Sequence, residues 1–353
     1  MKRLALRATG FAAAIAAGVI AGSAAQAETS LRWSDATPNR GDRAEHYQWI
    51  AAELEARSGG AITTDFHWAG ALLKLRAALG GVGDGAADMA TIIGAFAPKE
   101  LAAYTVTDLP TETPDPWVNM RASYELSTTH PALKKMFDDL NVHYVTNVTT
   151  TASHLLCKDK HINTLDDLKG TKIRAVGVYG RILGDLGAEV VRMGQGDVYQ
   201  ALDTGVVDCN QNYPYIIPVF KQQEVAKKLT QMDWGQFLAF GLVMNKDTYD
   251  GMSDAEKAVL AEVGSDAIDA FGERMVTATD ASMKLLADEG VDIQPMDAKA
   301  LAELNAAGQP HIEAWIAAAD EAGLPGQDIY DTYVGLLAKW EKTRVEQGYP
   351  WTR

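Results

Sequence analysis

The sequence predicts an α/β fold of two lobes that close like a clamshell, with mixed, mostly parallel sheets flanked by helices. Three observations predict it. Strand and helix patterns alternate along the chain, and the alternation restarts after residue 151. The chain has 353 residues, which is long for one ordinary domain and suits two. A helical pattern without proline over 254–288 is long enough to span the hinge between lobes.

The first 27 residues have the pattern of an export signal. A basic segment with Lys2, Arg3 and Arg7 precedes a short apolar stretch, and residues 25–27 form a small-x-small cleavage site. The apolar stretch is too short and too rich in Ala and Gly for a membrane anchor. We therefore expect a periplasmic chain that begins at Glu28 and has no stable membrane insertion.

The charge and the missing motifs exclude several functions. Without its signal the chain changes from a formal net charge of −15 to −18, because three cations are removed. Such an acidic surface repels nucleic acid and anionic lipid. The sequence has no nucleophile elbow, no phosphate-binding loop and no pair of histidines at metal-ligand spacing. We therefore expect no enzyme activity, no cofactor and no metal, and a monomeric state.

The first lobe is predicted over 28–151 and about 240–280. Its alternating strands and helices predict parallel pairing. Before the proline-rich segment 110–116, we expect strands over 30–35, 61–68 and 87–93. Helices are expected over 42–57 and 72–80. A helix over 117–140 and a strand over 142–149 follow, and the apolar segment 237–244 returns to this lobe.

The second lobe is predicted over about 152–239 and about 281–325. Its expected strands are 154–157, 171–176, 189–192, 206–209 and 291–294, and its helices are 164–169, 179–186, 196–204 and 298–322. Ser253 and Glu256 form a capping box that opens the long helix. The last segment, 326–353, is expected to hold a helix that packs on the lobes.

The two cysteines, Cys157 and Cys209, each end a predicted strand. An oxidising compartment permits one disulfide between them if the two strands are neighbours. The alternative is a pair of small buried thiols, because the sequence does not supply the Cβ geometry that a disulfide requires.

Arg174 ends a short buried strand pattern and has no evident partner in the sequence. A guanidinium carries five donors and stays charged, so a buried one needs an anion to face. In an exported chain without a catalytic motif, this predicts capture of a small carboxylate or a similar oxyanion. The alternative is an arginine in a structural ion pair.

Two motifs resemble those of the solute-binding proteins of tripartite ATP-independent periplasmic (TRAP) transporters. They are Leu-Asp-Asp-Leu-Lys-Gly-Thr-Lys-Ile-Arg over 165–174 and Asp-Val-Tyr-Gln-Ala-Leu-Asp-Thr-Gly-Val-Val-Asp over 197–208. The resemblance covers essentially the whole mature chain and implies the periplasmic-binding-protein clamshell. It also implies that Arg174 forms a bidentate salt bridge with the ligand carboxylate, and that the loaded protein delivers its ligand to a TRAP permease driven by an ion gradient.

The resemblance implies further site residues. Asn212 holds the place of a ligand-contacting asparagine, with Asn210 and Tyr213 as alternatives, because Tyr213 separates Asn212 from the following proline. His154 stands where the family often carries a second cation, so we expect a weaker contact or a neutral hydrogen bond there. Each of these residues has a plain structural alternative as a turn or strand-end residue. Further candidates are Trp68, Lys74, Tyr179, Gln195 and Trp234.

The expected function is therefore periplasmic capture of a small organic acid without catalysis. The identity of the acid stays open among mono- and dicarboxylates, keto acids, aromatic acids and sulfonates. One alternative is the binding component of another importer or of a sensor. The other is a secreted hydrolase or lyase that uses His154 with a carboxylate.

Overall fold

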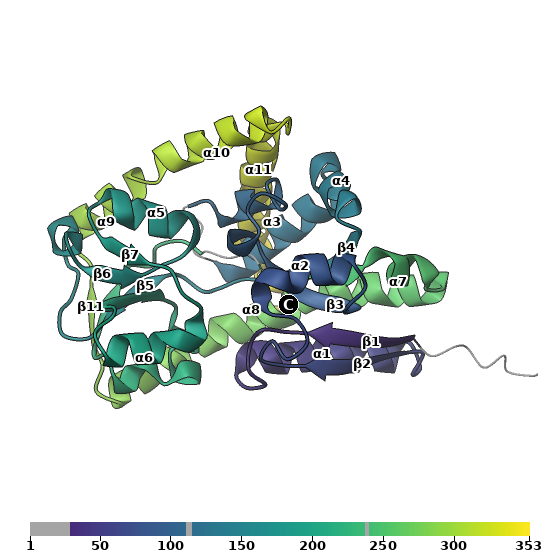
Figure 1. The fold of residues 1–353 in the computed structure, drawn as a ribbon, viewed down its shortest axis with the longest axis horizontal. Helices are drawn as coiled ribbons and strands as arrows, with labels where there is room; N and C mark the ends of the chain where they lie inside the picture. The colour runs from purple at the N-terminus through teal and green to yellow at the C-terminus, as the bar shows by residue number, and fades with distance from the viewer. Residues whose placement is uncertain (1–28, 111–114, 237–239) are drawn as a thin grey trace, which may run out of the picture.

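The computed structural model describes residues 29–110, 115–236 and 240–353, and it contains two α/β lobes side by side (Figure 1). Each lobe is built on one sheet. The export signal expected over 1–27 lies outside the described residues. Among the helices that are described, none combines the length and the apolar character that a bilayer span requires.

The sheet of the first lobe has five strands in the order β2-β1-β3-β10-β4. Strand β1 pairs in parallel with β2 and β3, whereas β10 is antiparallel to both β3 and β4. The chain builds most of the second lobe before it returns through β10, and it adds β11 to the second sheet later. The strands are β1 (Thr29–Ser34), β2 (Ile62–His67), β3 (Met89–Ile93), β4 (Val142–Val148) and β10 (Phe240–Asn245).

Five helices belong to this first sheet: α1 (Asp42–Arg57), α2 (Leu75–Gly83), α3 (Pro116–Thr129), α4 (Pro131–Asp139) and α7 (Lys246–Gly251). The single helix predicted over 117–140 is wrong, because it is two helices. His130 ends the first in an extended conformation and accepts the backbone N–H of Ala132 to cap the second. Pro131 explains the break, since proline disfavours a helical residue before it and suits a first helical position.

The sheet of the second lobe has six strands in the order β11-β9-β5-β8-β6-β7. Strand β5 is antiparallel to β8 and β9, and β6 is parallel to β7 and β8. The strands are β5 (His154–Cys157), β6 (Lys172–Arg174), β7 (Glu189–Val191), β8 (Cys209–Asn212), β9 (Lys228–Gln231) and β11 (Asp292–Pro295). Its helices are α5 (Gly177–Asp185), α6 (Val198–Asp203) and α9 (Ala298–Ala306).

The strand predicted over 206–209 is wrong in position. Strand β8 begins only at Cys209, because Gly205 has a positive φ of 75° and starts a turn in which Val206 is exposed. The correction places Asn210 and Asn212 inside the strand instead of in a loop after it.

Helix α8 (Asp254–Asp288) runs along both lobes (Figure 1). The predicted capping box is present, because Ser253 accepts from the backbone N–H of Glu256, whose carboxylate accepts from the backbone N–H of Ser253. Helix α8 packs on α1, α3 and β4 of the first lobe. Near its other end, Leu286 joins the apolar cluster of the second lobe.

The segment predicted as one helix over 298–322 is two helices, and this prediction is also wrong. Helix α10 (Gln309–Glu321) follows α9 after a break at Gly308, with Pro310 in its first turn. Helix α10 joins the lobes, since His311 lies 2.9 Å from Asp185 of α5 and Trp315 donates to Thr105 at 2.9 Å. Helix α11 (Gly326–Gln347) packs on α3 and α10.

Short 3₁₀ turns connect these elements. They are Gly94–Phe96, Tyr104–Asp108, Leu165–Leu168, Gln195–Asp197, Pro214–Ile216, Pro218–Phe220, Gln222–Glu224 and Pro350–Thr352. One apolar core runs through the first lobe and reaches Ile173, Tyr179 and Trp234 of the second. Apolar packing therefore continues from one lobe into the other, and the polar site described next lies at the side of this continuous core.

Candidate functional site

Arg174 is the last residue of β6 and is only 4 % exposed. Its Nε and Nη2 atoms donate to the carbonyl oxygen of Met193 at 3.1 and 3.0 Å. Within the described chain it forms no ion pair with a carboxylate and no hydrogen bond through Nη1. Burial lowers the pKa of Arg174 to about 10, against a small opposing effect of the Tyr213 phenol. The group therefore stays charged at neutral pH while its own protein supplies no counterion, a state that is costly without a functional reason.

Side chains from three neighbouring strands share the face that carries Arg174. In the sheet register Arg174 pairs with Asn210, and His154 pairs with Asn212. Register partners point to the same side of a sheet, and so do residues two apart on one strand. The sheet thus brings together four of the predicted site residues on one face.

A network of amides orders this face. Asn212 accepts from Nε2 of Gln195 at 2.8 Å and donates to Oε1 of Gln222 at 2.6 Å. Asn210 donates to the same Gln222 oxygen at 3.0 Å. The carbonyl oxygen of the Asn210 side chain and Nε2 of Gln222 are buried without a partner among the described residues. Such orphaned polar atoms are rare in protein interiors and are common where a ligand completes the bonding. Gln222 was not among the site residues predicted from the sequence.

His154 is a neutral donor in this structure. Its Nδ1 accepts the backbone N–H of Met232 at 3.2 Å, so the ring proton resides on Nε2. Burial lowers the pKa of His154 to about 4, although Asp233, 4.0 Å from Nε2, opposes the shift. His154 can therefore offer a hydrogen bond but no charge at neutral pH.

The predicted aromatic residues separate into two places. Tyr179 and Trp234 are buried and meet edge to face, with ring centroids 4.7 Å apart. Tyr179 also donates to the carbonyl oxygen of Gln236 at 2.7 Å. Trp68 instead stacks on Phe66, 4.6 Å away on an edge strand of the first lobe. Among the described residues, Trp68 has no hydrogen bond or ring contact with the residues of the Arg174 face.

A groove of about 1050 Å³ lies between the lobes beside this face. Met193, which binds Arg174 through its carbonyl, is part of the groove wall. Five cations line it against two acids, Asp108 and Asp197. The cations are Lys74, Arg76, Lys99, Arg181 and Arg192. Burial and the neighbouring Arg192 lower the pKa of Arg181. In a protein of strongly negative net charge, this groove is a local positive region.

The structure adds a second buried arginine that the sequence analysis missed. Arg43, in the first turn of α1, is 6 % exposed and donates from Nη2 to the hydroxyl of Tyr215 at 3.0 Å. It also approaches the hydroxyl of Tyr213 at 3.4 Å and lies 4.0 Å above the ring of Phe240. The sequence does contain a pattern that indicates burial of Arg43, because Arg43 lies four residues before Tyr47 on the buried face of the helix.

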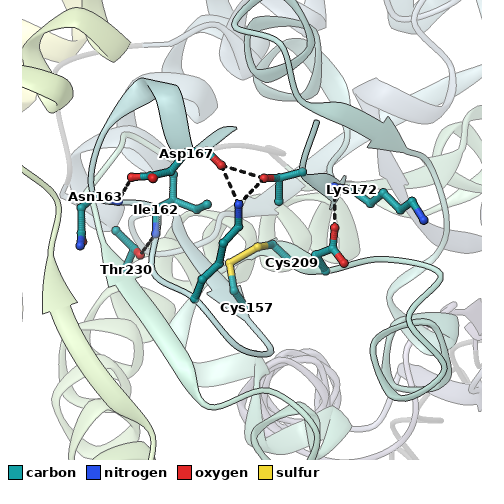
Figure 2. The surroundings of a disulfide bond; sticks show 10 residues. Cys157, Ile162, Asn163, Asp167, Lys172, Cys209 and Thr230 are labelled. Atoms are coloured by element: carbon teal, nitrogen blue, oxygen red, sulfur yellow. Dashed lines mark hydrogen bonds between the residues drawn. A yellow bond between two sulfur atoms is a disulfide. The ribbon is translucent and has the colours of Figure 1, made fainter. Parts of the chain in front are cut away.

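A disulfide joins Cys157 and Cys209, which are register partners on β5 and β8 (Figure 2). The same two strands carry His154 and Asn212 three residues farther along. Around the disulfide, the backbone N–H of Ile162 donates to Thr230 at 2.9 Å (Figure 2). No group of three or more His, Cys, Asp or Glu side chains in the described ranges is placed to hold a metal ion.

The chain is similar to known binding proteins. The family model "Bacterial extracellular solute-binding protein, family 7" (DctP) matches residues 34–318. A solute-binding protein of Albidiferax ferrireducens is 27 % identical over 226 residues, which are 62 % of this chain and 64 % of that protein. The C4-dicarboxylate-binding periplasmic protein DctP of Rhodobacter capsulatus is 37 % identical over 89 residues, 25 % of this chain and 26 % of that protein. The chain thus spans less than two thirds of the length of these curated relatives.

A solved structure covers more of the chain. It is a TRAP solute-binding protein from an unidentified microbe of a marine metagenome, described as specific for aromatic acids and bound to 3-hydroxybenzoate. It has 26 % sequence identity and a TM-score of 0.81, and the match covers 89 % of this chain and 99 % of that one. This agreement confirms the predicted two-lobed α/β fold.

Proposed function

Because this chain belongs to family 7 of the bacterial extracellular solute-binding proteins, we propose that it captures a small organic acid through Arg174 and delivers it to a TRAP permease. The observation that supports this most is the buried guanidinium of Arg174, which no carboxylate of the described chain neutralises. The family and the fold are those of transport proteins and not of enzymes.

The geometry suits one carboxylate in a fixed orientation. The Met193 carbonyl engages Nε and Nη2 and so fixes the plane of the guanidinium. Nη1 keeps both of its N–H groups and Nη2 keeps one, so the end of the fork can bind a carboxylate in a bidentate manner. Closure of the lobes removes water, and the lower local dielectric strengthens this ion pair. His154 and Asn210 flank the position with neutral hydrogen-bonding groups.

The relatives support an organic acid as the ligand. The metagenomic protein binds 3-hydroxybenzoate, and the Rhodobacter protein is named for C4-dicarboxylates. We infer that the buried pair of Tyr179 and Trp234 is the apolar wall of the ligand site. Aromatic side chains suit ligands with an apolar body.

The test is a titration of the Arg174→Met variant. Thermal-shift screening with benzoate, 3-hydroxybenzoate, succinate and D-glucuronate first identifies a probe, since a ligand at 100 times its dissociation constant adds about 2.7 kcal/mol of stability. Calorimetry should then show an affinity loss of about 30-fold to several thousand-fold, equivalent to about 2–5 kcal/mol. Arg353→Met, at an exposed C-terminal arginine, is the matched control. An Arg174→Met variant with wild-type affinity would contradict the proposal.

A further inference from the structure

The amides beside Arg174 form a network whose orientation is fixed at one end by the backbone. The backbone N–H of Tyr213 donates to Oδ1 of Asn212 at 2.9 Å. Because a backbone N–H only donates, the side-chain atom that it meets is the oxygen, and Nδ2 of Asn212 points the other way. That nitrogen donates to Oε1 of Gln222 at 2.6 Å. The orientation of the Gln222 amide therefore follows from that of Asn212.

Gln222 in turn sets the orientation of Asn210. Its Oε1 also accepts from Nδ2 of Asn210 at 3.0 Å. The other end of the Asn210 amide is therefore Oδ1, which is buried without a hydrogen-bond partner in the described part of the chain. Asn210 is the register partner of Arg174. The position next to the guanidinium thus offers a hydrogen-bond acceptor and not a donor.

We propose that Gln222 is a positioning residue of the ligand site, which fixes the amide of Asn210 so that Oδ1 faces the group adjoining the carboxylate of a bound acid. An adjoining hydroxyl donates to Oδ1 and satisfies it. A keto oxygen repels this acceptor, and a methylene leaves it unpaired, which is costly for a buried atom. The inference rests on the proposed function, because Arg174 must hold the carboxylate for Asn210 to meet the adjoining group.

The backbone holds Gln222 firmly in its place. The residue is fully buried, and its N–H donates to the carbonyl oxygen of Ile217 at 3.1 Å. Its own carbonyl oxygen accepts from the N–H groups of Val225 at 3.2 Å and Ala226 at 3.0 Å. The preceding Lys221 has a positive φ of 56°, a left-handed conformation that persists only where the surrounding structure holds it. The side-chain amide of Gln222 therefore starts from a fixed point of the backbone.

The amide network adjoins the groove between the lobes. Gln195 belongs to the network, because its Nε2 donates to Asn212 at 2.8 Å and its Oε1 lies 3.5 Å from Nδ2 of Asn210. In the chain Gln195 lies between Gly194 and Asp197, and both of these line the groove of about 1050 Å³. An acid that enters the groove therefore comes to the side of the network on which Gln195 lies.

The experiment compares acids of equal charge that differ only in the group adjoining the carboxylate. One set is propionate, lactate and pyruvate, and the other is phenylacetate, mandelate and phenylglyoxylate. Calorimetry measures their affinities for the wild type, Gln222→Met and the control Gln223→Met. Gln223 is a neighbouring buried glutamine that forms no hydrogen bond with either asparagine in the described chain. In one of the sets, the wild type should bind the hydroxy acid about tenfold more tightly than the keto acid.

Gln222→Met removes the oxygen that holds Nδ2 of Asn210, so this amide is free to turn and to donate to a keto oxygen. The affinity for the hydroxy acid should fall while that for the keto acid does not, and the preference should drop below about threefold. Gln223→Met should keep the preference of the wild type. Lost packing alone would weaken the binding of all three acids equally, so a changed preference distinguishes positioning from a structural role.

Three results would overturn the inference. The first is a wild type that shows no preference for the hydroxy acid, or no binding, in both sets. The others are a Gln222→Met variant that keeps the preference and one that loses affinity for all three acids equally. Gln222→Leu is the second variant if methionine prevents folding, which circular dichroism would reveal. Failure of the proposed function has a different signature, because Arg174→Met would then bind the acids as tightly as the wild type.

Discussion

Removal of the disulfide should lower stability without removing the ligand site. The double variant Cys157→Ala with Cys209→Ala deletes a cross-link between residues that are 52 positions apart in the sequence. The chain-entropy relation for a loop of this length gives a stabilisation of about 4 kcal/mol. The unfolded chain gains this freedom, while the folded strands keep their hydrogen bonds.

The site should persist because other contacts hold the same register. Strand β5 also pairs with β9, and β8 pairs with β6 at the position of Arg174 and Asn210. The pairing of His154 with Asn212 therefore does not depend on the sulfur atoms alone. We expect the affinity for an acid probe to change by less than about threefold, since the strand pairing survives.

Thermal unfolding followed by circular dichroism measures the effect. With about 2.1 cal/mol/K of unfolding entropy per residue, a mature chain unfolding as one unit should lose about 6 °C in Tm. A larger decrease would indicate that the second lobe unfolds by itself. The wild type in a reductant is the control and should match the variant. A variant within about 2 °C of the oxidised wild type, judged on the same entropy scale, would refute the reasoning.

Three further predictions concern acid, association and packing. Burial lowers the pKa of His46 to about 3 and the pKa values of His143 and His154 to about 4. Below pH 6.5, the ordinary pKa of histidine, these histidines bind more protons in the unfolded chain than in the folded one. The free energy of unfolding should therefore be highest above pH 6.5 and fall towards pH 4. A urea midpoint that is equal at pH 7.5 and pH 5 would disprove this. Arg192→Gln should slow the association of an acid probe a few-fold and weaken its salt dependence, with dissociation unchanged, in stopped-flow experiments. Gly264→Ala should destabilise the folded protein by about 1–3 kcal/mol, because its Cβ would lie 2.4 Å from the carbonyl oxygen of Val145. The control Gly335→Ala has open space around its Cβ and should stabilise the folded protein slightly. Denaturant unfolding compares the two variants, and equal effects would contradict the packing argument.

Local structure followed from the sequence where local signals agreed. Helix α1 has the bounds 42–57 that its periodicity predicts, and α8 begins at the capping box of Ser253 and runs to Asp288. The errors lie at 117–140 and 298–322, where apolar periodicity continues through a helix break. At Pro131 the restriction on the preceding residue outweighed that periodicity, and at Pro310 the missing backbone N–H suits only the first turn of a new helix.

The position of β8 required tertiary contacts. The valines of 206–209 have high strand propensity, yet the paired strand is Cys209–Asn212, which is polar. Propensity for a strand mainly reflects packing against neighbours. Here β8 pairs with β5 on one side and with β6 on the other, so its asparagines lie within the sheet. Hydrogen bonds with Gln195 and Gln222 stabilise the asparagine side chains.

By itself, the sequence determined that this chain carries a permanent cation at Arg174, because the charge of a guanidinium belongs to the residue and hardly depends on its surroundings. Only the tertiary structure decided that His154 is neutral and that Arg43 meets Tyr213, 170 positions away. Protonation of an imidazole depends on the water and charge around it. Contacts between distant segments depend on how the lobes pack, which no local pattern encodes.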